Sequence, residues 1–265
     1  MKAHTLSYKS SQITVYEHGA HLCSWVSQDR EQLFLSKEAN FNRGTAIRGG
    51  VPICSPQFAS FGYGRKHGFA RNLDWLLVEK ETQRMCFSLQ ANSSTREQWP
   101  HDFLLNFEIA LDERSLSMRL QVKNTGDTSF SFGTALHSYF RAEDVRHCQI
   151  VGLQNHRFWN NGEDFKQREC DDNAQLYVNG PIDRVYFNVE APVQLIEGDQ
   201  KREISKTGFQ DIVIWNPWKQ GAQTMQDMSD DEYLQMLCIE AANVDCPTAL
   251  GAGETWQGSQ SICLI

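Results

Sequence analysis

A short segment between residues 47 and 71 gathers the side chains best suited to binding an anion. It reads IRGGVPICSPQF from Ile47 to Phe58 and, after a glycine-rich stretch, HGFAR from His67 to Arg71. Arg48, Arg65 and Lys66 add to the positive charge. The planar guanidinium group of arginine matches the oxygens of a phosphate. The segment therefore predicts either a solvated loop with scattered charge or a pocket for an anionic group.

Two further stretches carry groups that could move protons. ALHSYF places His137 among apolar and aromatic residues, and CIEAANV places Glu240 inside an apolar run. A histidine in such a strand is more often a satisfied core residue than a catalyst. A glutamate is rarely buried without a partner or a function, unless Glu240 faces solvent. An acid and a base facing each other would suit proton transfer on a small polar substrate.

A fourth stretch, DRVYF, opens with Asp183 and Arg184 directly after an Asn-Gly-Pro turn. An aspartate at such a position can cap the turn, or it can join the same site. The acids, histidines and arginines lie far apart in the sequence, so a framework of several elements must bring them together.

Short segments rich in β-branched and aromatic residues supply that framework. Residues 116, 118, 120 and 122 alternate apolar with polar neighbours, which is the period of a half-buried strand. The segments that we expect to form strands are 13–17, 75–79, 85–90, 104–111, 115–122, 130–140, 148–153, 184–189, 193–197, 211–216 and 234–241.

Turn residues separate these segments, and signals for helices are weak. Asn-Thr-Gly-Asp follows residue 123, and Glu-Gly-Asp begins at residue 197. SDDEY, residues 229–233, predicts a short helical turn before the last strand of the set. Strands at short spacing with almost no helix between them predict a large, mostly antiparallel β-sandwich. Without repeats or a linker, we expect one domain over residues 1–265.

Composition limits the class of protein. The chain has 265 residues, 40% hydrophobic and 22% charged, with a net charge of −8. These values are typical of a folded globular chain, and the acidic balance argues against a nucleic-acid partner. No apolar run suggests a signal peptide or a membrane span.

The eight cysteines are scattered and include no CxxC pair, which argues against a zinc site or a disulfide framework. We expect reduced thiols, a cytoplasmic location and no membrane partner.

Six stretches, in chain order, resemble the glucose-6-phosphate 1-epimerases, the hexose-6-phosphate mutarotases of the aldose 1-epimerase superfamily. They are IRGGVPICSPQF, KHGFAR, ALHSYF, DRVYF, DIVIWNPW and MLCIEAANV. The resemblance runs from about Ile13 to the closing GETWQGSQSI and so covers nearly the whole chain. It implies a single β-supersandwich with a concave sugar-binding face.

The resemblance also implies the roles of individual residues. His137 would be the general acid and Glu240 the general base, a pair that opens and recloses the sugar ring. Neighbouring residues would bind the substrate: His67 and Asp183 the sugar hydroxyls, Arg48 and Arg71 the phosphate, and Gln57 a further sugar atom. Histidine titrates near neutrality, so His137 is expected to act as an imidazolium. Desolvation of Glu240 is expected to raise its basicity.

This reaction needs no metal, nucleotide or other cofactor. The expected partner is a small-molecule sugar phosphate, and the expected state is a monomer. Two alternatives stay open: an aldose 1-epimerase acting on free galactose or glucose, and a non-catalytic carbohydrate-binding domain on the same fold. The arginines argue against the first alternative, because a neutral sugar needs no anion clamp. His137 and Glu240 argue against the second.

Overall fold

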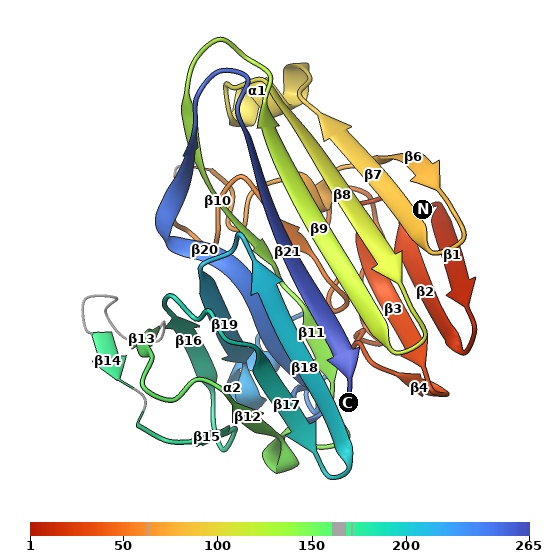
Figure 1. Ribbon diagram of the computed structural model, residues 1–265, viewed down its shortest axis with the longest axis vertical. Coiled ribbons are helices and arrows are strands. Elements are labelled where there is room, and N and C mark those ends of the chain that lie inside the picture. Colours follow the sequence, from red (N-terminus) through yellow and green to blue (C-terminus); the bar gives the residue numbers. More distant parts are fainter. Residues whose placement is uncertain (63, 161–167, 171) are drawn as a thin grey trace.

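Three antiparallel sheets form the framework of the protein. The computed structural model describes residues 1–62, 64–160, 168–170 and 172–265 (Figure 1). The smallest sheet is N-terminal and runs in chain order through β1 (Ala3–Tyr8), β2 (Ser11–Tyr16), β3 (His21–Ser27) and β4 (Arg30–Glu31).

The second sheet carries most of the residues that the sequence analysis selected. Its spatial order is β14 (Arg168–Cys170), β13 (Arg157–Asn160), β16 (Ile182–Tyr186), β19 (Asp211–Asn216), β20 (Met236–Leu250), β10 (Phe130–Leu136) and β5 (Ile53–Cys54). A further strand, β11 (Tyr139–Arg141), pairs with the beginning of β20.

The third sheet lies opposite and contains the longest antiparallel run. Its order is β15 (Gln175–Tyr177), β12 (Gln149–Val151), β17 (Val193–Glu197), β18 (Gln200–Thr207), β21 (Thr255–Leu264), β9 (Ser115–Asn124), β8 (Phe103–Leu111), β7 (Arg84–Gln90) and β6 (Leu76–Lys80). Figure 1 shows β8, β9 and β21 side by side along most of their length.

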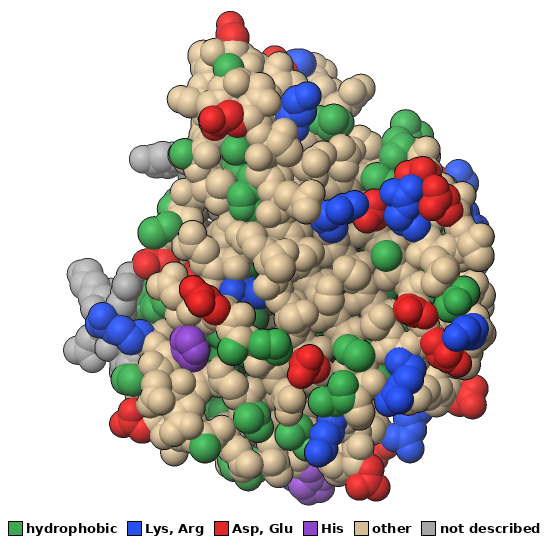
Figure 2. All heavy atoms as spheres, in the orientation of Figure 1, with side chains coloured by type: hydrophobic (Ala, Val, Ile, Leu, Met, Phe, Trp, Pro, Cys, Tyr) green, Lys and Arg blue, Asp and Glu red, His purple; other side chains and the backbone are tan. Residues whose placement is uncertain are grey.

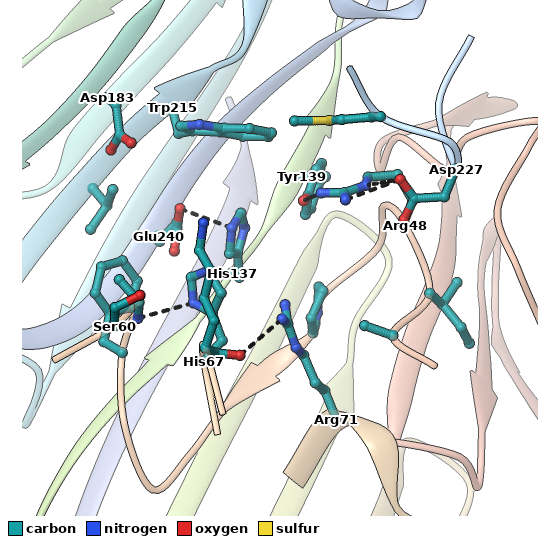
Figure 3. A pocket seen from close by; sticks show the side chains of 18 of the residues that line it. Arg48, Ser60, His67, Arg71, His137, Tyr139, Asp183, Trp215, Asp227 and Glu240 are labelled. Carbon is teal, nitrogen blue, oxygen red and sulfur yellow. Dashed lines mark hydrogen bonds and ion pairs between the residues drawn. The ribbon is translucent and has the colours of Figure 1, made fainter. Parts of the chain in front are cut away.

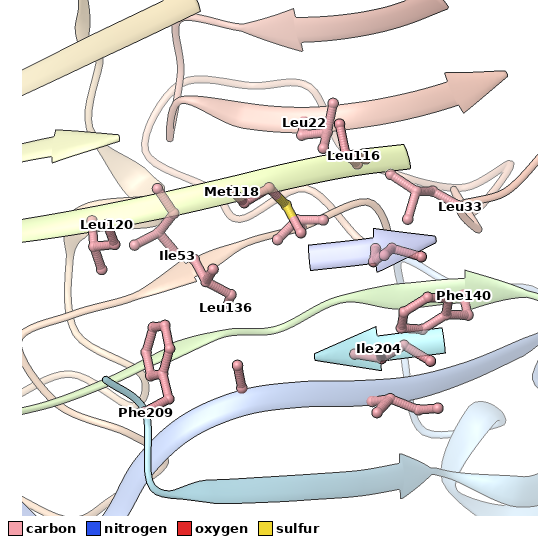
Figure 4. Close-up of a cluster of buried hydrophobic side chains, with 14 of the residues drawn as sticks. Leu22, Leu33, Ile53, Leu116, Met118, Leu120, Leu136, Phe140, Ile204 and Phe209 are labelled. Carbon is pink, nitrogen blue, oxygen red and sulfur yellow. The ribbon is translucent and has the colours of Figure 1, made fainter. Parts of the chain in front are cut away.

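Alternation of apolar and polar residues explains how these sheets pack. In β8 every second residue from Phe103 to Leu111 is buried, and β9 repeats the pattern with the opposite phase. The buried side chains enter one large core together with residues of the other two sheets (Figure 4). Leu22 of β3, Met118 of β9 and Leu136 of β10 meet there. The predicted β-sandwich is confirmed.

Helices are few and short in the described residues. They are α1 (Ser93–Gln98), α2 (Trp218–Ala222) and the 3₁₀ turns η1 (Ala70–Asn72), η2 (Val145–His147) and η3 (Glu232–Gln235). The turn η3 confirms the prediction from SDDEY. The sequence analysis missed α1, whose 6 residues are too few to show an apolar period, although Asn92 caps it by accepting from the N–H of Thr95. None of the described helices has the length and apolar character of a membrane span.

Charged side chains of both signs are interspersed on the face shown in Figure 2. On β8, Glu108 forms ion pairs with Arg84 at 2.9 Å and with Arg119 at 2.6 Å. Exposed ion pairs of this kind each contribute little to the stability of the fold.

One predicted strand is interrupted. Residues 130–140 were expected to form a continuous strand, but β10 ends at Leu136 and β11 begins at Tyr139. His137 and Ser138 lie in the break, and this interruption positions His137 for the site.

Candidate active site

A cavity of about 460 Å³ opens over the second sheet and is closed on its other side by the segment 46–71. Its polar, charged and aromatic lining (Figure 3) includes Arg48, Ser60, Lys66, His67, Arg71, His137, Tyr139, Asp183, Trp215, Asp227 and Glu240. Concave sites with a few convergent polar groups are typical of small-molecule binding.

Three neighbouring strands place an acid or an aromatic ring on the same face of the sheet. Asp183 of β16 pairs with Trp215 of β19, and Val213 of β19 pairs with Glu240 of β20. Paired residues and alternate residues of a strand share a face. The register therefore points all four side chains into the cavity (Figure 3).

His137 and Glu240 face each other because one register runs through the break between β10 and β11. Leu136 pairs with Ala241 and Tyr139 pairs with Cys238, so His137 lies opposite Glu240. The distance from Nε2 of His137 to Oε1 of Glu240 is 3.4 Å, and both side chains are buried.

Burial is the main cause of the pKa shifts of both side chains. It raises the pKa of Glu240 well above the ordinary value, to which Asp183 adds while Arg71 opposes it. Burial also lowers the pKa of His137 well below the ordinary value, with smaller contributions from His67 and the two cavity arginines. Both shifts favour the same form of the pair, a protonated carboxyl group beside a neutral imidazole.

These shifts bear on both expectations for the pair. The raised pKa of Glu240 agrees with the greater basicity expected from desolvation. The lowered pKa of His137 disfavours a resting imidazolium, and its role as general acid in the reaction stays a prediction. Nδ1 of His137 and Oε2 of Glu240 are buried and have no hydrogen-bond partner among the described residues.

Two aromatic rings hold His137. The ring of Tyr139 is stacked on it, with centroids 4.8 Å apart and an interplanar angle of 10°. Trp215 contacts both rings edge-on, at 5.8 Å from His137 and 6.0 Å from Tyr139. The imidazole is therefore confined on two sides, which limits its rotation.

His67 enters the cavity from a left-handed backbone conformation, with φ 65. Such a conformation is uncommon for a residue with a side chain and is found most often at functional sites. The N–H of Ala59 donates to Nδ1 of His67 at 3.2 Å, so Nδ1 is an acceptor and Nε2 carries the hydrogen. Burial lowers the pKa of His67 to about 3, and the nearby Arg71 adds to this effect. His67 is therefore a neutral hydrogen-bond donor.

Arg48 lines the cavity but is already engaged. Its Nε and Nη2 donate to Oδ1 of Asp227 at 3.2 and 3.1 Å, and its Nη1 donates to the hydroxyl of Tyr139 at 3.0 Å. A guanidinium group has five N–H bonds. Three of them have partners among the described residues, so two N–H bonds remain for a ligand.

Arg71 and Lys66 supply further positive charge. Arg71 lies in η1, and its Nη2 donates to the carbonyl oxygen of Lys66 at 3.3 Å. Its Nε is buried without a hydrogen-bond partner among the described residues. Arg48 and Arg71 both line the cavity, and both lower the pKa values of His67 and His137.

Six of the seven predicted site residues line this cavity, and Gln57 does not. The six are Arg48, His67, Arg71, His137, Asp183 and Glu240. Gln57 is buried behind the wall, where its Nε2 donates to the carbonyl oxygens of Ala59 and Gly64 and its Oε1 accepts from the N–H of Gly64. The expected sugar contact of Gln57 is therefore corrected to support of the loop from Phe58 to Lys66. Tyr63 of that loop lies outside the described residues.

The glycines beside Arg48 and His67 serve backbone packing. A Cβ on Gly50 would lie 2.2 Å from the carbonyl oxygen of Leu22, and one on Gly68 would lie 2.0 Å from that of Ser55. Both glycines also have positive φ. They allow the segment to pack closely against neighbouring backbone.

The cavity residues missed from the sequence include Tyr139, Trp215 and Asp227. Tyr139 lies two residues after His137, so a strand reading of ALHSYF could have placed both on one face. Asp227 lies in a loop between α2 and η3, and no local signal distinguishes it from its acidic neighbours. Among the described residues, no group of histidine, cysteine or acidic side chains has the geometry of a metal site.

Comparison with known proteins agrees with this geometry. The profile of the family described as aldose 1-epimerase matches residues 2–263. A protein of Cenchrus ciliaris is 34% identical, covering 95% of this chain and 80% of its own length. One of Salmonella typhimurium is 33% identical, covering 93% and 84%. The names of both relatives propose glucose-6-phosphate 1-epimerase activity.

Solved structures share the whole architecture. The crystal structure of YeaD from Salmonella typhimurium, described as a proposed mutarotase, superposes with a TM-score of 0.90. It is 30% identical, and the match covers 98% of this chain and 89% of YeaD.

Proposed function

The chain belongs to the aldose 1-epimerase family, and on that premise we propose that it interconverts the α and β anomers of a hexose 6-phosphate. Glucose 6-phosphate is the first substrate to test, because the names of the relatives propose it. The observation that carries the proposal is the pair His137 and Glu240, 3.4 Å apart in a cavity that also contains Arg48 and Arg71.

Anomer exchange requires two proton transfers. Glu240 as carboxylate removes the proton of the C1 hydroxyl, and His137 as imidazolium donates a proton to the ring oxygen. The C1–O5 bond breaks, the aldehyde turns about C1–C2, and reclosure on the other face returns both protons. Each positioned group contributes about 10²–10⁴-fold. Because the reaction is reversible, each group acts as acid in one direction and as base in the other.

Substrate binding prepares the pair for this step. Before substrate binds, burial is the main reason that the proton rests on Glu240, and Arg48 and Arg71 disfavour the charged imidazole to a smaller degree. A phosphate dianion beside the arginines offsets their charge and removes that smaller part of the effect. Glu240 can act as the base only after its proton has crossed the 3.4 Å gap to His137.

The remaining lining residues hold the sugar. The neutral Nε2–H of His67 donates to a hydroxyl oxygen, and Asp183 accepts from a hydroxyl on the other side of the cavity. Arg71 and the two unused N–H groups of Arg48 bind the phosphate. The chain acts as one domain over residues 1–265, as a monomer in the cytoplasm, without a nucleic-acid or membrane partner. Its acidic net charge and its eight free cysteines support this setting.

A neutral aldohexose is the second candidate substrate. Asp227 and Tyr139 already occupy much of the guanidinium group of Arg48, and a free sugar would leave that arrangement intact.

Magnetisation-exchange NMR between the α and β anomers decides between these substrates. Glucose 6-phosphate, mannose 6-phosphate, glucose and galactose are compared at equal concentration, with Glu240→Gln as the control for uncatalysed exchange. Faster exchange of the phosphorylated sugars supports the proposal. Equal or greater acceleration of free sugars would contradict it.

A further inference from the structure

Asp227 is a carboxylate beside Arg48, in the part of the cavity where we expect the 6-phosphate to bind. This part is called the phosphate end. Asp227 lines the cavity together with three cationic side chains, Arg48, Lys66 and Arg71. Figure 3 shows Asp227 beside Arg48, with Asp183 and Glu240 at the opposite end of the cavity. A negative charge at this place repels a phosphate, so its presence calls for an explanation.

The contacts of Asp227 show one part of its role. A single oxygen, Oδ1, accepts from both Nε and Nη2 of Arg48, and the hydroxyl of Tyr139 accepts from Nη1. The side chains of Arg48 and Asp227 are only 24% and 28% exposed, so the pair is partly shielded from solvent. The guanidinium group is thus held from two sides, and its last two N–H bonds keep a fixed direction.

The charge balance shows the other part. Of the side chains that line the cavity, these three cations and Asp227 together carry a net charge of two positive units. A phosphate monoester carries close to two negative units at neutral pH. Without Asp227 these side chains would carry three positive units, and that charge favours more highly charged anions.

We propose that Asp227 determines the charge selectivity of the phosphate end, by orienting Arg48 and by reducing the positive charge to that of one phosphate monoester. The inference rests on the proposed function, because it assigns this end of the cavity to the 6-phosphate. It also predicts that Asp227 weakens anion binding overall, in exchange for discrimination between anions of different charge.

Asp227→Asn tests the proposal, because the amide oxygen can still accept from Arg48 while the charge is lost. Asp102→Asn is the matched control: it removes one negative charge from an ion pair with Arg96 outside the cavity lining. Calorimetry at constant ionic strength measures the affinities of wild type and both variants for inorganic phosphate and for pyrophosphate.

We expect Asp227→Asn to bind inorganic phosphate roughly three- to thirtyfold more tightly than wild type does, the range expected for one charge in a partly exposed site. The gain should be larger for pyrophosphate, and Asp102→Asn should match wild type. If wild type shows no measurable binding of inorganic phosphate but Asp227→Asn binds it, that result also supports the proposal. Unchanged or weaker binding by Asp227→Asn, or an equal gain for both anions, overturns it.

Activity provides an independent measurement. In Asp227→Asn the KM for glucose 6-phosphate should fall, and the KM for free glucose should change by a smaller factor. If wild type exchanges neither sugar, the proposed function fails, but calorimetry still decides whether Asp227 sets the charge selectivity.

Discussion

Tyr139 lies face to face with His137, their rings 4.8 Å apart and nearly parallel, while its hydroxyl accepts a hydrogen bond from Arg48. One side chain thus connects the arginine proposed to hold the phosphate with the histidine proposed to move the proton. The connection lies within ALHSYF, where the strand break sets the direction of both rings.

Substitutions of Tyr139 separate its two contacts. Tyr139→Phe keeps the stacked ring, so kcat for glucose 6-phosphate should stay within a few-fold of wild type while KM rises. Tyr139→Leu removes the ring, and kcat should fall by roughly tenfold, the equivalent of one aromatic pair. Steady-state exchange kinetics provide both constants. Equal losses of kcat in the two variants would show that the hydroxyl, and not the ring, is what matters.

Glu240→Gln should remove activity and increase stability. The amide cannot accept the O1 proton as a base, so exchange should slow by about 10²-fold or more. Because the folded-state pKa of Glu240 is raised, its carboxyl group destabilises the fold as pH rises above about 4.5. The stability of the Gln variant relative to wild type should therefore grow with pH, with a slope of up to about 1.4 kcal/mol per pH unit.

Denaturant unfolding at pH 4, 6 and 8 measures this difference. The two proteins should agree most closely at pH 4, and the curves should separate as pH rises until the folded carboxyl group ionises. A Gln variant less stable than wild type at pH 8 would mean that Glu240 is folded as a stabilised carboxylate.

The pH profile of wild-type activity should be a broad plateau with two limbs. The pair loses its single-proton form on the acid side when His137 is protonated, and the lowered pKa of His137 moves this limb below about 6.5. On the alkaline side the raised pKa of Glu240 delays loss of the last proton. Exchange rates from pH 4 to 10, corrected for the enzyme-free rate, test this. A narrow maximum centred near pH 5.5 would contradict the two shifts.

Arg71→Ala should weaken hexose 6-phosphate by about 2–3 kcal/mol, near a hundredfold, through the loss of charged hydrogen bonds. Activity on free glucose should not fall in the same way, because that substrate has no phosphate for Arg71 to bind. The comparison uses kcat/KM for both sugars in the same variant. A similar loss for both would assign Arg71 to the sugar and not to the phosphate.

Inorganic phosphate should activate the exchange of free glucose. It would occupy the place of the 6-phosphate and offset the arginines, which lower the pKa of His137 to a smaller degree than burial does, so the gain should be modest, about two- to tenfold. The same phosphate should inhibit exchange of glucose 6-phosphate by competition. Glu240→Gln with phosphate is the control for catalysis by the buffer. If phosphate increases the exchange rate of free glucose no more with wild type than with this control, the 6-phosphate serves only to anchor the substrate.

The strands and most of the site could be predicted from the sequence, because both depend on local pattern. Alternation in residues 115–122 determines which side of β9 is buried, and a glutamate within an apolar run indicates a function. The pairing of Arg48 with Asp227 could not be predicted, since it joins residues through the tertiary fold. The hydrogen bonds of Gln57 stay within its own loop and depend on a loop conformation that no local pattern predicts. The protonation of His137 depends on burial, which no single stretch reveals.

Gly50 and Gly68 lie so close to neighbouring carbonyl oxygens that neither position has room for a side chain. Any redesign of this catalyst toward another sugar is therefore restricted to the groups that reach into the cavity. The backbone around Arg48 and His67 therefore has to keep its present conformation. Substitution of exposed lining residues such as Ser60 or Lys66 should leave the geometry of His137 and Glu240 unchanged.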